Sequence, residues 1–231
     1  MRFTDRSLRI IVTLIFLLVL FLSSFINVTP VSAVSIYVTT TDDEDVDNGV
    51  CSLREAIIAA NDDKDYNGCT AGSGDDEIYL EADTYTLTSG FRLPAITSEI
   101  GIYGVSSGDT TFPGQRWAET IIEADTCNPV EEPCSHDHGI FNISDEGDLL
   151  LGDLTIRHAR YTSSISFGGA INNDGVLYIS HCLVINNEAS RGGAIFNDDG
   201  DVTIDYCAFT GNKGGSLNLA GAIYNAGDMT I

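Results

Sequence analysis

Two groups of acidic side chains are the first candidates for chemistry. Asp198, Asp199 and Asp201 lie within four residues of one another. Carboxylates so placed could hold Ca²⁺ beside a base, as polysaccharide lyases require, or act as the acid and base of an inverting glycoside hydrolase. The segment 41–49 (TDDEDVDNG) has partly alternating oxygens that could bind Ca²⁺, but it lacks the glycine and glutamate spacing of an EF-hand. We favour the simpler interpretation of both groups as solvated acidic turns.

Histidine and arginine form two further groups. The stretch 136–138 (His-Asp-His) contains side chains that could ligate a metal ion. Arg157, His158 and Arg160 are the best basic group for binding an anionic sugar. The surrounding chain is strongly acidic, however, and would repel a polyanionic substrate such as pectate. We expect His136 and His138 to be exposed polar residues, and we predict no catalytic residue, no cofactor and no metal site.

The start of the chain resembles an export signal. Arg2, Arg6 and Arg9 precede an apolar run over 10–26, and residues 31–33 read Val-Ser-Ala. This order is typical of a secretory signal peptide and its cleavage site. A run of about 17 residues is at the short end for a membrane helix, so an uncleaved anchor is the alternative. In both cases we expect a secreted or cell-surface protein with no membrane insertion beyond the signal segment 1–33.

The charge of the remaining chain restricts its partners. Without residues 1–33, 8 basic and 33 acidic side chains remain, a formal charge of −25. Nucleic acid is excluded as an expected partner, because binding phosphates requires clustered Lys and Arg. An anionic membrane surface is disfavoured for the same reason. The length suits one domain, and the 23 glycines favour an all-β, loop-rich secreted protein over a helical bundle.

A repeat of about 25 residues organises the second half of the chain. The segments 175–187 (GVLYISHCLVINN) and 200–212 (GDVTIDYCAFTGN) match at a constant step of 25, and 149–159 fits the same frame. The phrases GGAINN, GGAIFN and AGAIYN begin at positions 168, 192 and 220. Apolar alternation between Gly, Asn and Asp predicts two or three strands of four or five residues in each unit. Such a unit encloses its apolar face only by stacking on others, so we predict an all-β parallel β-helix.

The repeat gives its recurring residues structural roles. These residues are Gly169, Ile171, Asn173, Cys182, Asn187, Gly193, Ile195, Asn197, Cys207, Asn212, Ile223 and Asn225. The isoleucines should point inward, and the variable residue after each, such as Phe196 or Tyr224, outward. The asparagines tolerate the left-handed backbone of tight turns, and their amides can stack from coil to coil. The glycines fit positions with φ > 0 or without room for a Cβ. The two cysteines would be stacked as free buried thiols or, at this spacing, joined in a disulfide.

The segment 51–61 predicts the one helix of the mature chain. Ser52 and Glu55 form a capping box, and positions 53, 56, 57 and 60 make one apolar stripe. We expect this helix to cover the open edge of the first coil, after a strand at 36–40. Fainter strand patterns follow at 77–88, 98–104, 120–124 and 139–143.

Four of the six cysteines suggest local disulfides. Cys51 and Cys69 bracket an acidic polar segment, and Cys127 and Cys134 bracket a short loop. Disulfides are expected in an exported chain. Closing the 18-residue loop between Cys51 and Cys69 would contribute on the order of 3 kcal/mol.

Two motifs resemble known families. CSLREAI at 51–57 resembles the CSLREA-type domain found at the start of exported bacterial surface proteins, over roughly 34–90. The GGAI phrases and FTGN at 209–212 resemble the GGAI and FxxN repeats of the polymorphic outer membrane protein family, from roughly 149 to the end. This range lies in the predicted β-helix repeats of 91–231. The resemblance implies a right-handed β-helix on a cell surface, usually without a demonstrated reaction. Because GDMTI at 227–231 repeats GDVTI at 200–204 and then stops, we also expect a fragment that ends in mid-coil.

Two functions fit the sequence. The first is a non-enzymatic surface or adhesion protein that presents outward side chains to a protein or glycan. The second is a carbohydrate-active β-helix enzyme, either a lyase or a hydrolase. An enzyme would need three or more carboxylates or basic groups on one outer face over adjacent coils, and the repeat does not supply them, so we favour the first. A Ca²⁺-stabilised scaffold is a third hypothesis.

Overall fold

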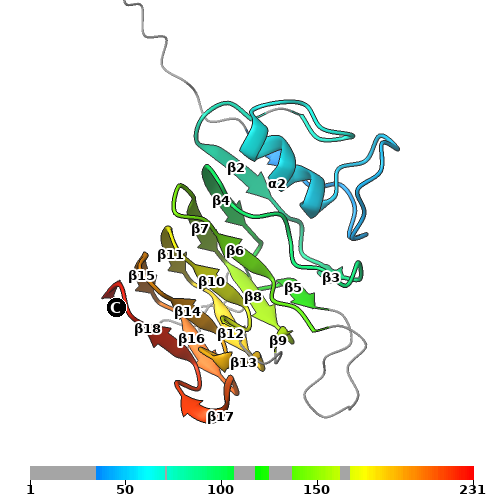
Figure 1. Ribbon diagram of the computed structural model, residues 1–231. Coiled ribbons are helices and arrows are strands. Elements are labelled where there is room, and N and C mark those ends of the chain that lie inside the picture. Colours follow the sequence, from blue (N-terminus) through cyan, green and yellow to red (C-terminus); the bar gives the residue numbers. More distant parts are fainter. Residues whose placement is uncertain (1–34, 71, 107–117, 125–136, 162–166) are drawn as a thin grey trace, which may run out of the picture. The chain divides into compact units, whose positions relative to one another are not determined.

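The computed structural model describes residues 35–70, 72–106, 118–124, 137–161 and 167–231 (Figure 1). Within these ranges there is one helix, α2 (Leu53–Asp62), and the named strands pair in parallel in every sheet. The all-β parallel class predicted from the sequence is therefore correct. No helix in this part of the chain is long and apolar enough to cross a membrane.

The described strands form four parallel sheets. The seven-stranded sheet has the order β1 (Ser35–Tyr37), β2 (Asp76–Tyr79), β4 (Glu99–Tyr103), β7 (Asp148–Gly152), β11 (Val176–Ser180), β15 (Asp201–Asp205) and β19 (Asp228–Thr230). The five-stranded sheet has the order β16 (Ala208–Thr210), β12 (Leu183–Ile185), β8 (Leu154–Arg157), β5 (Thr120–Ala124) and β3 (Thr84–Leu87). The four-stranded sheet contains β18 (Ile223–Asn225), β14 (Ile195–Asn197), β10 (Ile171–Asn173) and β6 (Phe141–Ile143). The three-stranded sheet contains β17 (Lys213–Leu219), β13 (Glu188–Arg191) and β9 (Arg160–Tyr161).

From β7 onward the chain visits the sheets in a fixed cycle. It passes through the seven-, five-, three- and four-stranded sheets, returns to the first, and repeats this round until β19. Figure 1 shows β7, β11 and β15 of successive rounds side by side. Ile171, Ile195 and Ile223 are paired in register, as are the residues 25 apart in β11 and β15. The repeat alignment therefore matches the strand register.

Each of these rounds contains four strands, where the sequence predicted two or three. Single residues with left-handed backbone make the corners. Asp153, His181 and Tyr206 (φ 49–55°) separate the seven- and five-stranded sheets in successive rounds. His158 and Asn186 (φ 60° and 55°) lie at the corners between the five- and three-stranded sheets. Because a corner of one or two residues leaves no Gly- or Pro-rich loop and the strands have as few as two residues, period-2 alternation does not separate them.

The paired asparagines form ladders in the interior. Asn173 Nδ2 donates to Asn197 Oδ1 (2.7 Å), and Asn197 Nδ2 donates to Asn225 Oδ1 (2.6 Å). Asn212 Oδ1 accepts from the backbone N–H of Asn187 at 3.0 Å. The predicted coil-to-coil amide bonds are present. The predicted left-handed backbone is wrong for Asn173 and Asn197, because they end strands and the corner residue Asn186 has that conformation instead.

Glycines in the GGAI phrase have two separate roles. Gly168 and Gly192 have left-handed backbone, with φ of 63° and 59°. A Cβ on Gly169 would meet the carbonyl oxygen of Gly193, and one on Gly193 would meet that of Gly221. The first glycine therefore makes a corner, and the second allows close approach of the next round.

The cysteines divide into a disulfide and two free thiols. Cys51 and Cys69 are joined, with Cα atoms 4.7 Å apart. Cys182 and Cys207 are free, and the backbone N–H of Cys182 lies 3.4 Å from Cys207 Sγ. Burial raises the pKa of Cys182, whereas the hydrogen bond from Cys182 lowers the pKa of Cys207. The predicted pair Cys127 and Cys134 lies outside the described residues.

Helix α2 begins at the predicted capping box. Ser52 Oγ accepts from the Glu55 backbone N–H at 3.2 Å, and Glu55 Oε2 accepts from the Ser52 N–H at 3.0 Å. The predicted apolar stripe at 53, 56, 57 and 60 is buried. The helix packs against β1, β2 and β4, and β1 is the edge strand of the seven-stranded sheet.

Candidate binding site

The acidic triplet does not assemble a site. Asp198, Asp199 and Asp201 are exposed at the turn between β14 and β15. Among the described residues, no three His, Cys, Asp or Glu side chains come together in a way that could hold a metal ion. Their arrangement matches the expected solvated turn.

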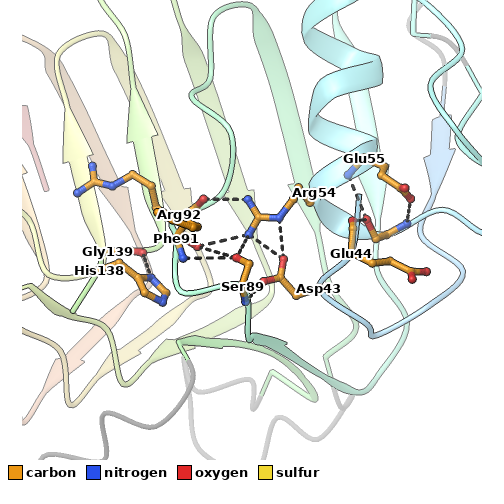
Figure 2. Close-up of polar contacts among 10 residues, drawn as sticks. Asp43, Glu44, Arg54, Glu55, Ser89, Phe91, Arg92, His138 and Gly139 are labelled. Atoms are coloured by element: carbon orange, nitrogen blue, oxygen red, sulfur yellow. Dashed lines mark hydrogen bonds and ion pairs between the residues drawn. The ribbon is translucent and has the colours of Figure 1, made fainter. Parts of the chain in front are cut away.

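The histidine stretch is only partly described. His136 lies outside the described residues. His138 is buried, so the exposed position expected for it is wrong, and its Nδ1 lies 2.8 Å from the Gly139 carbonyl oxygen (Figure 2). This placement turns one ring nitrogen toward backbone and away from an open coordination site.

The predicted basic group is neutralised by neighbouring acids. Arg157 Nε lies 2.6 Å from Glu123 Oε2, and Arg160 Nε lies 3.7 Å from Glu188 Oε2. Burial and the Arg157 charge lower the pKa of His158, although Glu123, 3.4 Å away, opposes this shift. The group ties strands of successive rounds together, β8 to β5 and β9 to β13, and offers no free cation for an anionic sugar.

The acidic segment 41–49 is bound to other parts of the chain. Asp43 pairs with Arg54 at 2.7 Å. Asp45 Oδ1 accepts from Tyr66 Oη at 2.9 Å and from Asn67 Nδ2 at 3.1 Å. These two carboxylates therefore have protein donors in place of a cation.

The CSLREAI motif has a structural explanation for its charged residues. Arg54 donates to Asp43 and to the backbone carbonyl oxygens of Phe91 and Arg92 (Figure 2). Glu55 is fully buried, and its Oε1 accepts from the Val46 N–H at 2.8 Å as well as from Asn67 Nδ2. Arg54 and Glu55 thus join α2 to the segments before and after it, and Glu55 also has the capping role expected for it.

A cluster of arginines and aromatic rings lies along the three- and four-stranded sheets, and Arg92 joins it from the segment between β3 and β4. We call it the arginine–aromatic face, and it consists of Arg92, Tyr161, Phe167, Asn172, Arg191, Phe196 and Tyr224. The Phe196 ring is tilted against that of Phe167 and stacked on that of Tyr224, with centroids 4.5 and 4.9 Å apart. The Arg191 guanidinium lies 5.4 Å from the Phe167 centroid and 5.9 Å from that of Tyr224. These distances are within the range of cation–π attraction.

The structure corrects the prediction that Phe196 is presented to a partner. Its side chain lies outside the main apolar core, as the alternation in β14 requires, but only 4% of the residue is exposed. Phe167, which precedes β10, and Tyr224 cover its two faces. The sequence did not indicate this cover, because Phe167 belongs to no recurring phrase. The accessible rings are those of Phe167 and Tyr224, which are half-buried.

A cavity of about 260 Å³ opens at the other end of this face. It is lined by Arg92, Tyr161, Phe167 and Asn172. The Arg92 guanidinium lies 5.1 Å from the Tyr161 ring centroid, and its Nη1 donates to Asn142 Oδ1 at 3.1 Å. Burial lowers the pKa of Arg92. A cation, aromatic walls and an amide therefore meet at a single opening.

Comparison with known proteins gives no relative from which a role could be transferred. No family model, no curated protein and no solved structure matches this chain.

Proposed function

We propose that this chain is a secreted or cell-surface protein of the right-handed parallel β-helix class, and that it binds a ligand at its arginine–aromatic face without catalysing a reaction. The observation that carries the proposal is the pair Arg92 and Arg191. Neither has an ion-pair partner among the described residues, whereas Arg54, Arg157 and Arg160 each face a carboxylate. Cations without counter-ions in so acidic a chain favour a binding role over a structural one.

The architecture and location belong to the same proposal. The fixed cycle through parallel sheets supports a β-helix, with α2 as the cap over its first coil. The Cys51–Cys69 disulfide supports export, because disulfides persist in oxidising compartments. The CSLREA-type and polymorphic outer membrane protein-like motifs favour a cell surface. The neutralised Arg157 group and the exposed acidic triplet favour binding over polysaccharide cleavage.

The test is a binding screen with a charge-matched pair of variants. The full chain is applied to arrays of glycans and of extracellular proteins, alongside Arg191→Gln and Lys213→Gln. Both substitutions remove one positive charge, but Lys213 is exposed and contacts no aromatic ring in the described part of the chain, whereas the Arg191 guanidinium lies over two rings. We expect hits that Arg191→Gln weakens and Lys213→Gln leaves unchanged. Hits that both variants weaken equally would reflect net charge alone and would contradict the proposed site.

A further inference from the structure

Arg92 is placed where its charge is incompletely satisfied. The residue lies between β3 and β4, and its backbone carbonyl oxygen accepts from Arg54 Nη1 at 2.9 Å (Figure 2). Its guanidinium reaches across to β6, where the Asn142 carboxamide oxygen is its one recorded hydrogen-bond acceptor among the described residues. A guanidinium has five N–H donors, so most of them remain for another group.

The surroundings of Arg92 cover part of its charged group. The residue is half-buried, and the Tyr161 ring lies over one face of the guanidinium. Taking a cation out of water without a counter-ion is costly, and a carboxylate that pairs with two parallel N–H groups offsets that cost best. The geometry around Arg92 therefore fits a carboxylate.

The size and walls of the cavity restrict what can carry that carboxylate. At about 260 Å³ the cavity is near the lower limit of small-molecule pockets, about 300 Å³. It accommodates one ring. Phe167 and Tyr161 provide apolar surfaces for the C–H face of such a ring. The Asn172 amide oxygen can accept from a hydroxyl group, whereas its Nδ2 already donates to Asn142 Oδ1 at 3.1 Å and to Asp174 Oδ2 at 3.3 Å. A ring with hydroxyls and one carboxylate is an acidic sugar.

The charge near the cavity argues against polyanions. Asn172 Nδ2 lies 3.3 Å from Asp174 Oδ2, and burial together with Asp198, Asp145 and Asp199 raises the pKa of Asp174. A chain of uronic acids or a sulfated glycan would bring repeated charges against these carboxylates. A single acidic residue, at a chain end or isolated in a neutral glycan, avoids that repulsion.

We propose that the Arg92 cavity binds one acidic sugar residue, with its carboxylate on the Arg92 guanidinium, its ring against Phe167 and Tyr161, and its hydroxyls on Asn172. This assignment rests on the proposed binding function of the arginine–aromatic face and names its ligand class. It requires no covalent step.

The experiment compares sugars that differ in the carboxylate. Binding of methyl β-glucuronide and methyl β-glucoside to the full chain is measured by saturation-transfer NMR and calorimetry. We expect the glucuronide to bind at least tenfold more tightly, because charge-assisted hydrogen bonds account for about ten- to hundredfold in affinity. Acetylglycine, a peptide-like carboxylate without a sugar ring, is expected to bind as weakly as the glucoside.

Variants test the residue assignment. We expect Arg92→Gln to lose at least tenfold in glucuronide affinity, Arg92→Lys to lose less, and Lys213→Gln to match the wild type. Phe167→Leu, which retains an apolar side chain, should weaken both sugars, so it serves as a second test if Arg92→Gln fails to fold. Thermal unfolding followed by circular dichroism establishes that each variant is folded.

Three results would overturn the assignment. They are equal binding of the two sugars, unchanged affinity in Arg92→Gln, and binding of acetylglycine as tight as that of the glucuronide. Failure here is distinguishable from failure of the proposed function. If array hits persist in Arg92→Gln but fall in Arg191→Gln, the face binds a different ligand class and only the acidic-sugar assignment is wrong.

Discussion

The buried asparagine ladder predicts a large loss of stability from one amide. Asn197 is fully buried. Its side chain accepts from Asn173 Nδ2 at 2.7 Å, donates to Asn225 Oδ1 at 2.6 Å, and donates to the Gly200 carbonyl oxygen at 2.7 Å. Each bond contributes about 1 kcal/mol net, and a buried partner left unpaired costs about 1–3 kcal/mol. We therefore expect Asn197→Ala to lower the free energy of unfolding by about 3 kcal/mol, a large part of the usual 5–15 kcal/mol.

The same ladder provides the matched control. Asn225 is exposed at the other end of the contact, where its Nδ2 donates to the Gly227 carbonyl oxygen at 2.8 Å. After Asn225→Ala, Asn197 keeps its bond to Gly200 and water can replace the lost partner, so we expect a cost of about 1 kcal/mol or less. Urea unfolding of the full chain, followed by far-ultraviolet circular dichroism, measures both values. The two variants should differ in the urea concentration at the unfolding midpoint and not in the dependence of the unfolding free energy on urea concentration.

A charged replacement separates the hydrogen bonds from side-chain volume. Asn197→Asp keeps the shape of the side chain but removes both N–H donors and places a carboxylate beside the Gly200 carbonyl oxygen. Burial would raise the pKa of this carboxyl group, so the stability of the variant should be greatest in acid and fall as the pH rises through that raised pKa. If Asn197→Ala costs no more than Asn225→Ala, or if Asn197→Asp shows no such pH dependence, the ladder is not a source of stability and the reasoning fails.

Three further predictions concern α2, the thiols and His158. Glu55→Gln should lower the free energy of unfolding by about 2 kcal/mol, because charge-assisted bonds to three donors are weakened, whereas the exposed control Asp42→Asn should change it little in the same urea assay. Under native conditions a thiol reagent should label Cys207 before Cys182, because Cys207 is more exposed and its pKa is lowered. Mass spectrometry of the labelled peptides measures the order, and faster labelling of Cys182 would contradict its burial. Because burial lowers the pKa of His158, its contribution to stability is present above its usual pKa near 6.5 and is lost as the pH falls. Asparagine tolerates the left-handed backbone at this position, so His158→Asn should lose less stability than the wild type between pH 7 and pH 5. The same pH dependence of stability in variant and wild type would refute this.

Features that depend on spacing along the chain could be predicted from the sequence. The 25-residue step predicted the pairing of β11 with β15, since in-register parallel strands repeat equivalent residues. The Ser52 and Glu55 spacing predicted the start of α2, because a capping box acts over three residues. Both signals are local or periodic, so no knowledge of the tertiary contacts was needed.

Features that depend on tertiary contacts could not be predicted from the sequence. His181 and Tyr206 form corners with left-handed backbone although neither is a usual turn residue. Their rings stack with centroids 5.2 Å apart, which is a contact between successive rounds. The burial of Phe196 by Phe167 is another contact of this kind. Arg92 lies 50 residues from Asn142 and belongs to no repeat, so neither spacing nor composition marked it as part of a site.

The placement of the arginines gives the candidate site its strongest physical argument. Arg157 on β8 meets Glu123 on β5, and Arg160 on β9 meets Glu188 on β13, so each of these cations compensates an acid on the neighbouring round. In a chain with a large negative charge, such pairs relieve repulsion between stacked acids. Arg92 meets only an amide and a ring, and its desolvation is not offset by any carboxylate in the described part of the chain. The proposed carboxylate ligand would offset that cost, which gives a physical reason for a charged residue at this position.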